Sequence, residues 1–128
     1  MNLTIFAYLY GFATLIAVLF QLALAAGIPW GHLAMGGRFP GKFPPNMRVG
    51  AVVQAGILTF LACIVLSRAG VAFPGLTTLS NTLIWVVVGI SGISLVLNLI
   101  TPSKWERRLW APVGLVMVVC SLVVALSA

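Results

Sequence analysis

Acidic side chains are almost absent from this sequence: Glu106 is the only one among 128 residues. Charged residues of both signs make up 6% of the chain, whereas soluble domains carry roughly a quarter. Because water solvates a folded chain through its polar surface, so low a charge content excludes an ordinary water-soluble domain. The hydrophobic content of 62% and the mean hydropathy of +1.19 indicate a protein that folds in a lipid bilayer.

Histidine and cysteine are also scarce. His32 is the single histidine, and Cys63 and Cys120 lie inside separate apolar runs. Protein zinc sites need several suitable ligands close together, and two cysteines cannot form a disulfide framework. We therefore expect no metal and no other cofactor. No spacing supports a hydrolytic set of Ser103, His32 and Glu106 either, so we expect no enzyme activity.

The net charge of +6 comes from seven Lys and Arg residues against the one acid. A basic balance is the usual mark of nucleic-acid binding, but here the basic residues lie between hydrophobic runs. Anionic lipid headgroups attract such juxtamembrane residues by roughly 1 kcal/mol each. We therefore expect contact with anionic membrane lipids and none with nucleic acid.

Four apolar runs divide the chain, at about residues 3–26, 49–67, 77–100 and 109–127. Each is close to the roughly 20 residues that a helix needs to cross a bilayer. Backbone groups in lipid must bond within their own segment, so runs of this length predict helices. The first run is too long for a secretory signal and has no basic start, which predicts a retained span. The predicted fold is all-α: one four-helix transmembrane bundle over residues 1–128.

The connecting segments differ in charge. Segments 27–48 and 101–108 hold six basic residues, which are Arg38, Lys42, Arg48, Lys104, Arg107 and Arg108. The segment between the second and third runs holds only Arg68. Since cytoplasmic loops carry the excess of Lys and Arg, we predict that both basic loops face the cytoplasm and both termini face outward. The expected location is the inner (plasma) membrane, as a multi-pass protein.

Aromatic residues accompany the basic ones. Residues 27–46 include five glycines and four prolines, which predicts irregular backbone. This loop either lies on the headgroups, covers the mouth of the bundle, or is a plain connector. The predicted surface for lipid headgroups or a partner protein comprises Trp30, His32, Arg38, Lys42, Arg48, Lys104, Trp105, Arg107, Arg108 and Trp110.

Ser103 and Glu106 match the Ser-x-x-Glu capping box, in which each side chain accepts a hydrogen bond from a backbone N–H of the first helical turn. This pattern predicts a short interfacial helix that starts after Ser103 and leads toward the fourth span. Pro112 would then kink or restart the helix, because proline cannot donate to the preceding turn. Glu106 could alternatively carry a proton or pair with a substrate. The cap, with a pairing to a neighbouring arginine, is the simpler interpretation.

Several polar side chains lie inside the apolar runs: Gln21, Gln54, Ser91, Ser94 and Asn98. Such groups are costly in hydrocarbon unless they are hydrogen-bonded, so we expect them to face the bundle interior. They predict either a small cavity open to the cytoplasm or hydrogen bonds between helices, which contribute about 0.6 kcal/mol each on average.

Two groups of residues carry a resemblance. The first basic segment holds Gly27, Pro29, Trp30, Gly31, Gly36 and Gly37, and the second region holds Asn98, Ser103, Glu106, Arg107 and Pro112. In these positions the chain resembles a loose group of uncharacterised bacterial four-helix integral membrane proteins. The resemblance implies the same four-helix topology over the whole chain and implies no activity.

Ionisable side chains all lie in the loops or at the predicted interfaces. Transporters and proton relays usually keep such groups inside their spans. We therefore expect a membrane accessory or scaffold protein that binds lipid or a partner protein, which could be a second copy. The alternative is a small-solute transporter or channel that uses Gln21, Gln54 and Asn98. It would be a dimer, because four helices rarely enclose a pore alone.

Overall fold

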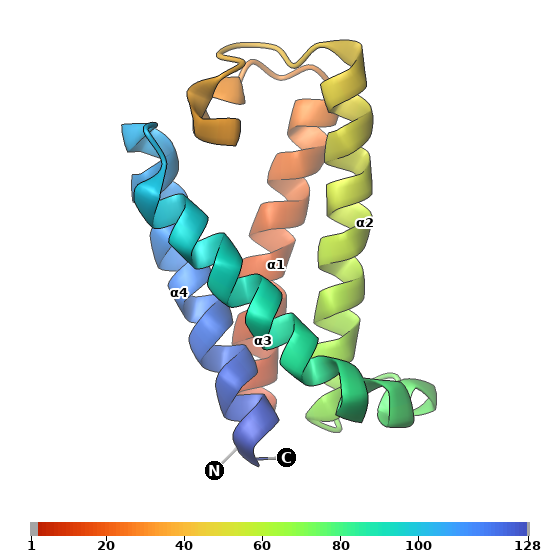
Figure 1. The fold of residues 1–128 in the computed structure, drawn as a ribbon. Helices are drawn as coiled ribbons and strands as arrows, with labels where there is room; N and C mark the ends of the chain where they lie inside the picture. Colours follow the sequence, from red (N-terminus) through yellow and green to blue (C-terminus); the bar gives the residue numbers. More distant parts are fainter. Residues whose placement is uncertain (1–2, 128) are drawn as a thin grey trace.

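The computed structural model describes residues 3–127, which form four long helices (Figure 1). Their bounds are α1 Leu3–Ala25, α2 Pro45–Arg68, α3 Thr77–Ile100 and α4 Lys104–Ser127. Each helix is long and apolar enough to cross a membrane, and no strand occurs within residues 3–127. The chain is an all-α, multi-pass membrane protein, and its four helices form a bundle in which consecutive helices run in opposite directions.

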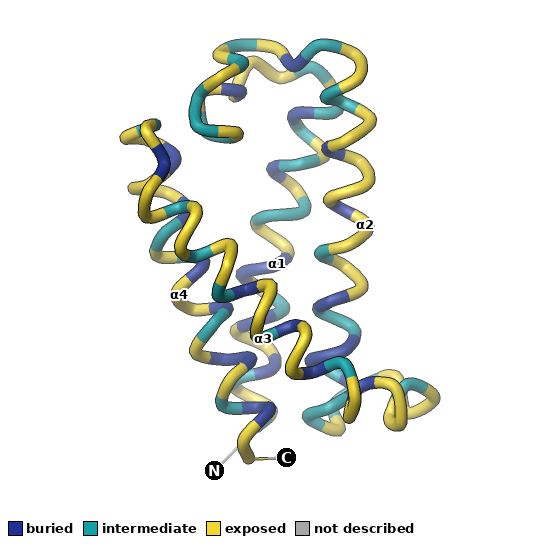
Figure 2. The backbone as a smooth tube through the Cα atoms, in the orientation of Figure 1, coloured by how far each residue is buried: buried dark blue, intermediate teal, exposed yellow. Residues whose placement is uncertain are grey.

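The exposed faces of the helices, yellow in Figure 2, carry many large apolar side chains. Leu19, Val49, Ile93 and Leu126 are each more than half exposed, and they represent all four helices. A water-soluble protein rarely exposes contiguous apolar surface on this scale. Acyl chains solvate such faces, so the surface fits the membrane location.

The two ends of the bundle differ in their connections (Figure 1). We call the end with residues 26–44 and 101–103 the basic end, and the end with residues 69–76 the Arg68 end. α1 begins and α4 ends at the Arg68 end (Figure 1). This arrangement agrees with the predicted topology, while the side of the membrane that each end faces stays a prediction.

Two helices begin before the apolar spans that the sequence predicted. α2 begins at Pro45 rather than at residue 49, because Pro44 is extended (φ −65°, ψ 160°) and Pro45 occupies the first helical position. Proline suits that position because its fixed φ is helical and its missing N–H is not needed there. α4 begins at Lys104, where the capping-box pattern predicted a helix start, and it continues without a break into the span predicted from residue 109. The predicted loop ranges 27–48 and 101–108 were therefore too long, since polar residues at the interface continue both helices.

Pro112 lies inside α4 without ending it. The predicted separate interfacial helix was therefore wrong: one helix runs from Lys104 to Ser127. The missing N–H of Pro112 deprives the carbonyl of Arg108 of its usual partner. Arg108 is exposed, so water or headgroups can bond that carbonyl, and the helix continues.

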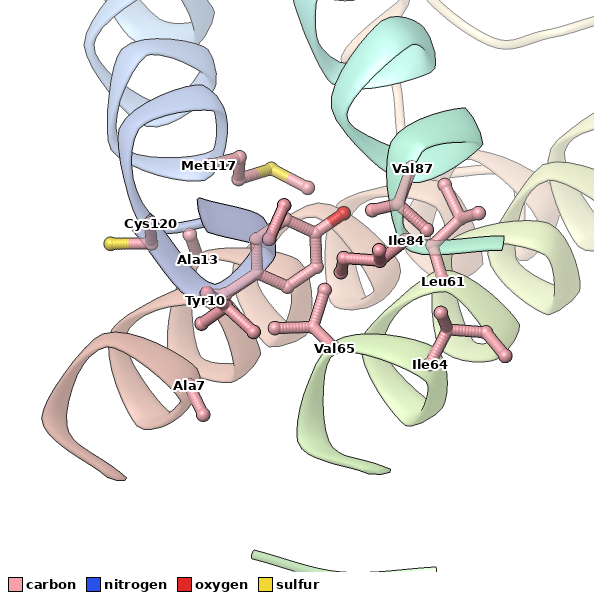
Figure 3. Packing of buried hydrophobic residues seen from close by; sticks show 12 residues of the cluster. Ala7, Tyr10, Ala13, Leu61, Ile64, Val65, Ile84, Val87, Met117 and Cys120 are labelled. Atoms are coloured by element: carbon pink, nitrogen blue, oxygen red, sulfur yellow. The ribbon is translucent and has the colours of Figure 1, made fainter. Parts of the chain in front are cut away.

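Side chains from all four helices fill the half of the bundle toward the Arg68 end (Figure 3). Tyr10 is fully buried there, together with Ile64, Ile84 and Val124. The hydroxyl of Tyr10 lies 3.3 Å from Oγ of Ser91, a hydrogen bond between α1 and α3. This half is a packed core.

Arg68 holds three helices together at its own end. Its Nη1 donates to Oδ1 of Asn81 on α3 (3.1 Å), and its Nη2 donates to the carbonyl of Ala125 on α4 (3.4 Å). Toward the basic end α3 leans away from α2 and lies beside α4 (Figure 1). The α2–α3 contact is the least extensive among helices that follow one another in the chain. The bundle is therefore closed at the Arg68 end and looser at the basic end.

Candidate functional site

A cavity of about 740 Å³ occupies the basic half of the bundle. Its wall comes from all four helices and from part of the loop that joins α1 to α2, and most of its lining is apolar. Ligand pockets in proteins measure roughly 300–1,000 Å³, so this volume suits a small molecule or part of a lipid. The polar side chains that line it include Gln21, Gln54, Ser91, Ser94, Asn98 and Glu106.

All five polar residues that the sequence analysis placed inside the spans therefore meet at one cavity. Of the five, only Ser91 forms a side-chain hydrogen bond to another helix within residues 3–127, to Tyr10 on α1. The side chains of Gln21, Gln54, Ser94 and Asn98 make no hydrogen bond within residues 3–127. Helix-to-helix bonding accounts for Ser91 alone, and the other four line the cavity without such a bond.

The α1–α2 loop is bonded to the start of α4 at the basic end. Oγ of Ser103 donates to the carbonyl of His32 at 2.7 Å. Nε1 of Trp110 donates to the carbonyl of Leu33 at 2.9 Å. The two basic segments thus form one structure that covers the cavity from the basic end. Ser103 and His32 do meet, but through the histidine backbone rather than the imidazole.

Glu106 faces this loop and the cavity. It is 6% exposed, and its Oε2 accepts a hydrogen bond from the N–H of Gly36 at 3.3 Å. Half of the predicted capping box forms, since the N–H of Glu106 donates to Oγ of Ser103 at 3.2 Å. The other half does not form: the N–H of Ser103 donates to Oγ1 of Thr101 at 3.3 Å. Arg107 donates to the carbonyl of Thr101 at 3.2 Å rather than to the carboxylate.

The Gly36 contact depends on a left-handed turn. Met35, Gly36 and Gly37 have φ angles of 54°, 68° and 78°. Glycine adopts such angles readily, whereas Met35 is strained by them, at a cost of order 1–3 kcal/mol. This turn brings Met35 and Gly36 to the cavity wall and directs a backbone N–H at the only acid.

Aromatic rings line the same part of the cavity. Phe20, Phe43 and Trp110 all contribute to its wall. Phe20 meets Trp110 edge-on with 4.8 Å between ring centroids, and it stacks on Trp30 at 6.4 Å with an interplanar angle of 2°. Trp110 is only 9% exposed, so its predicted place on the headgroup surface was wrong. It is buried because its N–H finds a carbonyl partner inside the protein.

The remaining residues of the predicted headgroup surface lie at the basic end, and eight are exposed: Trp30, His32, Arg38, Lys42, Lys104, Trp105, Arg107 and Arg108. Arg108 and Lys104 lie over the ring of Trp105, at 5.5 and 6.0 Å from its centroid. Arg48 is half-buried, and its Nε donates to the carbonyl of Phe43 at 2.8 Å. Its guanidinium lies against Gly27 just after α1, where a cation stabilises a helix C-terminus. Arg48 therefore has a structural role.

No protein-family model, curated protein or solved structure matches this chain. Within residues 3–127, no three His, Cys, Asp or Glu side chains form a group that could hold a metal ion. The groups that the cavity offers are one carboxylate, side-chain amides and hydroxyls, and aromatic rings. The lining is therefore mostly apolar, with a few polar groups among the apolar side chains.

A Ser103→Ala variant is expected to lower the free energy of unfolding by about 1–2 kcal/mol. The substitution removes the acceptor for the N–H of Glu106 and the donor to the carbonyl of His32, and loss of an N-terminal cap alone costs roughly 0.5–2 kcal/mol. Thermal unfolding in detergent, followed by circular dichroism, measures the change. Ser94→Ala is the matched control, because Ser94 is exposed and bonds no residue within 3–127. Equal stability of the two variants would contradict the prediction.

Proposed function

We propose that this protein is a non-enzymatic accessory or scaffold protein of the inner (plasma) membrane that binds lipid through its cytoplasmic face. The basic end is then the cytoplasmic end and both termini face outward, as the positive-inside rule favours. The observation that supports binding most is the shape of the cavity. It lies in the basic half, while packed side chains fill the Arg68 half. A cavity that a packed core blocks at one end and the joined basic segments cover at the other suits retention of a molecule better than its passage.

The exposed surface of the basic end supports contact with anionic headgroups. Trp105 is 57% exposed and has two cations over its ring. Tryptophan is enriched at membrane interfaces, and each basic residue near the surface adds roughly 1 kcal/mol of attraction to anionic lipid. A partner protein in the membrane, or a second copy, would meet the same surface.

Neutralising the exposed cations is expected to remove the preference for anionic lipid. The variant replaces Arg38, Lys42, Lys104 and Arg108 with glutamine, in a Trp85→Phe background that leaves tryptophans only at the basic end. Quenching of tryptophan fluorescence by brominated anionic lipid, relative to brominated zwitterionic lipid, measures the preference. The Trp85→Phe protein with its cations intact is the control. An unchanged preference for anionic lipid in the neutralised protein would refute the proposed headgroup contact.

The second candidate is a small-solute transporter or channel that works as a dimer. The meeting of Gln21, Gln54 and Asn98 at one cavity favours it. A solute would still have to pass the core around Tyr10, so transport requires a rearranged or dimeric state. Solute flux into liposomes that disappears in an Asn98→Leu variant would support this function. A monomeric, impermeable preparation would count against it.

A further inference from the structure

The cavity has its one negative charge at the basic end. Glu106 is more than nine-tenths buried, and within residues 3–127 the N–H of Gly36 is the hydrogen-bond partner of its carboxylate, with no basic side chain paired to it. Buried carboxylates are normally paired with a cation, because removal from water strongly disfavours an isolated charge. The cavity is therefore complementary to a ligand that brings a positive charge.

The surroundings of Glu106 fit an ammonium group. Gln21 and Asn98 lie within the last five residues of α1 and α3 at this end, and they line the cavity with amide groups that no residue within 3–127 bonds. A primary ammonium has three N–H donors for amide oxygens and for the carboxylate. The rings of Phe20 and Trp110, which pack edge to face against each other, form an aromatic part of the cavity wall.

The rest of the lining fits hydrocarbon. From Met47 to Leu61 the cavity follows α2 for about 21 Å, at a helical rise of about 1.5 Å per residue. Most of this length is apolar. Leu97 and Ile100 of α3 line the cavity, yet they are 58% and 69% exposed. The wall between α2 and α3 is therefore incomplete, and in a membrane that side faces acyl chains.

A cation lies at the rim next to the buried acid. Arg107 is exposed, and its Nη1 bonds the carbonyl of Thr101, a residue of the cavity wall. The carboxylate inside and the guanidinium at the rim match a head group that carries an ammonium at its tip and a phosphate behind it. A lipid with only a phosphate would bring a negative charge toward Glu106.

We propose that the cavity binds a membrane phospholipid with a primary ammonium head group. The ammonium lies at Glu106, the phosphate lies near Arg107, and an acyl chain leaves between α2 and α3 into the bilayer. This inference rests on the proposed lipid-binding function and specifies the lipid class. It assigns that lipid to the cavity, whereas the exposed cations contact anionic headgroups at the surface.

Native mass spectrometry of the detergent-purified protein tests the assignment. The probes are dioleoyl phosphatidylethanolamine, phosphatidylcholine and phosphatidylglycerol, added in equal amounts. The wild type is expected to retain phosphatidylethanolamine over the other two. Glu106→Gln is expected to weaken that retention at least about tenfold, since a hydrogen bond to a charged group is lost. The amide oxygen of the substituted side chain still accepts from the N–H of Gly36, so the loop stays in place.

A cavity-filling pair provides the matched control. Gly50 lines the cavity and Gly56 does not, while a Cβ at either position meets nothing within 4 Å. Gly50→Leu is expected to exclude the lipid, and Gly56→Leu is expected to retain it. Both substitutions lie on α2 and remove a glycine from a helix, so a fold defect alone would affect them equally.

The outcomes separate the two proposals. Retention of phosphatidylethanolamine by Glu106→Gln and by Gly50→Leu, or equal retention of all three lipids by the wild type, would overturn the cavity assignment. The protein with Arg38, Lys42, Lys104 and Arg108 replaced by glutamine is expected to keep phosphatidylethanolamine while it loses its preference for anionic lipid. If this protein loses its preference for anionic lipid and keeps phosphatidylethanolamine, both the surface contact and the cavity assignment are supported. If the preference for anionic lipid persists, only the surface contact is overturned.

Discussion

A Gly31→Ala variant is expected to lose the folded loop at the basic end and about 3–5 kcal/mol of unfolding free energy. A Cβ on Gly31 would clash with the carbonyl oxygen of Phe39 and would lie 2.7 Å from the carbonyl oxygen of Gly41. Both obstacles are backbone atoms, which cannot turn aside as a side chain can. The N–H of Gly31 also donates to that Gly41 carbonyl at 2.9 Å, so relief of the clash breaks this bond. The expected loss lies in the upper tail of single-substitution effects.

Gly75→Ala is the control for the Gly31 prediction. Gly75 lies in the loop at the Arg68 end, and a Cβ there meets nothing within 4 Å. Thermal unfolding in detergent, followed by intrinsic tryptophan fluorescence, reports stability and the environment of the rings at the basic end. If Gly31→Ala unfolds at the same temperature as Gly75→Ala, the close approach of the backbone segments has no energetic role.

A Trp110→Ala variant is expected to lose about 3–5 kcal/mol, the usual range for removal of a buried aromatic side chain. The indole of Trp110 is 9% exposed and meets the ring of Phe20 at 4.8 Å. Its N–H also bonds the carbonyl of Leu33, on the loop. The variant therefore loses packing inside the bundle and one of the bonds that hold the loop to α4.

Two further variants separate these contributions. Trp110→Phe keeps a ring but leaves the Leu33 carbonyl without its donor, for an expected loss of about 1–3 kcal/mol. Trp105→Ala removes a tryptophan that is 57% exposed, and the expected change is within about 0.5 kcal/mol. The same fluorescence-detected unfolding measures all three proteins. A Trp110→Ala protein as stable as Trp105→Ala would show that the buried ring contributes little.

The spans could be predicted because the bilayer imposes length and hydropathy on each helix. α3 matches its predicted range, residues 77–100. The start of α2 was missed, because hydropathy ends where polar residues begin while the helix continues into the interface. The helix start after Ser103 was predicted, and the error for α4 was to separate that helix from the fourth span at Pro112. The Pro44-Pro45 pair before α2 was the local signal that was not used.

The polar lining of the cavity was also predictable in part. Unpaired amides avoid lipid, which placed Gln21, Gln54 and Asn98 on the inside. The choice between a cavity and hydrogen bonds between helices depends on how far α2 and α3 separate, and no sequence pattern reports that distance.

The burial of Trp110 could have been predicted if residues 104–127 had been treated as one helix. Glu106, Trp110, Gly114 and Met117 are all buried, at a spacing of three or four residues that marks one face of a helix. Because the residues before Pro112 were assigned to a loop and a separate short helix, this continuous buried face was not recognised. The bonds from Trp110 to Leu33 and from Glu106 to Gly36 could not be predicted, because they depend on how the helices pack.

The bonds between the α1–α2 loop and α4 join residues that are 70, 71 and 77 positions apart. The ribosome synthesises the chain from the N-terminus to the C-terminus. Therefore α1, the glycine-rich loop after it and α2 are made well before Ser103, Glu106 and Trp110. Until these residues emerge, the carbonyls of His32 and Leu33 have only water or headgroups to bond. This end of the molecule therefore cannot be completed before α4 has been made, and a nascent chain that stops at α3 still lacks it.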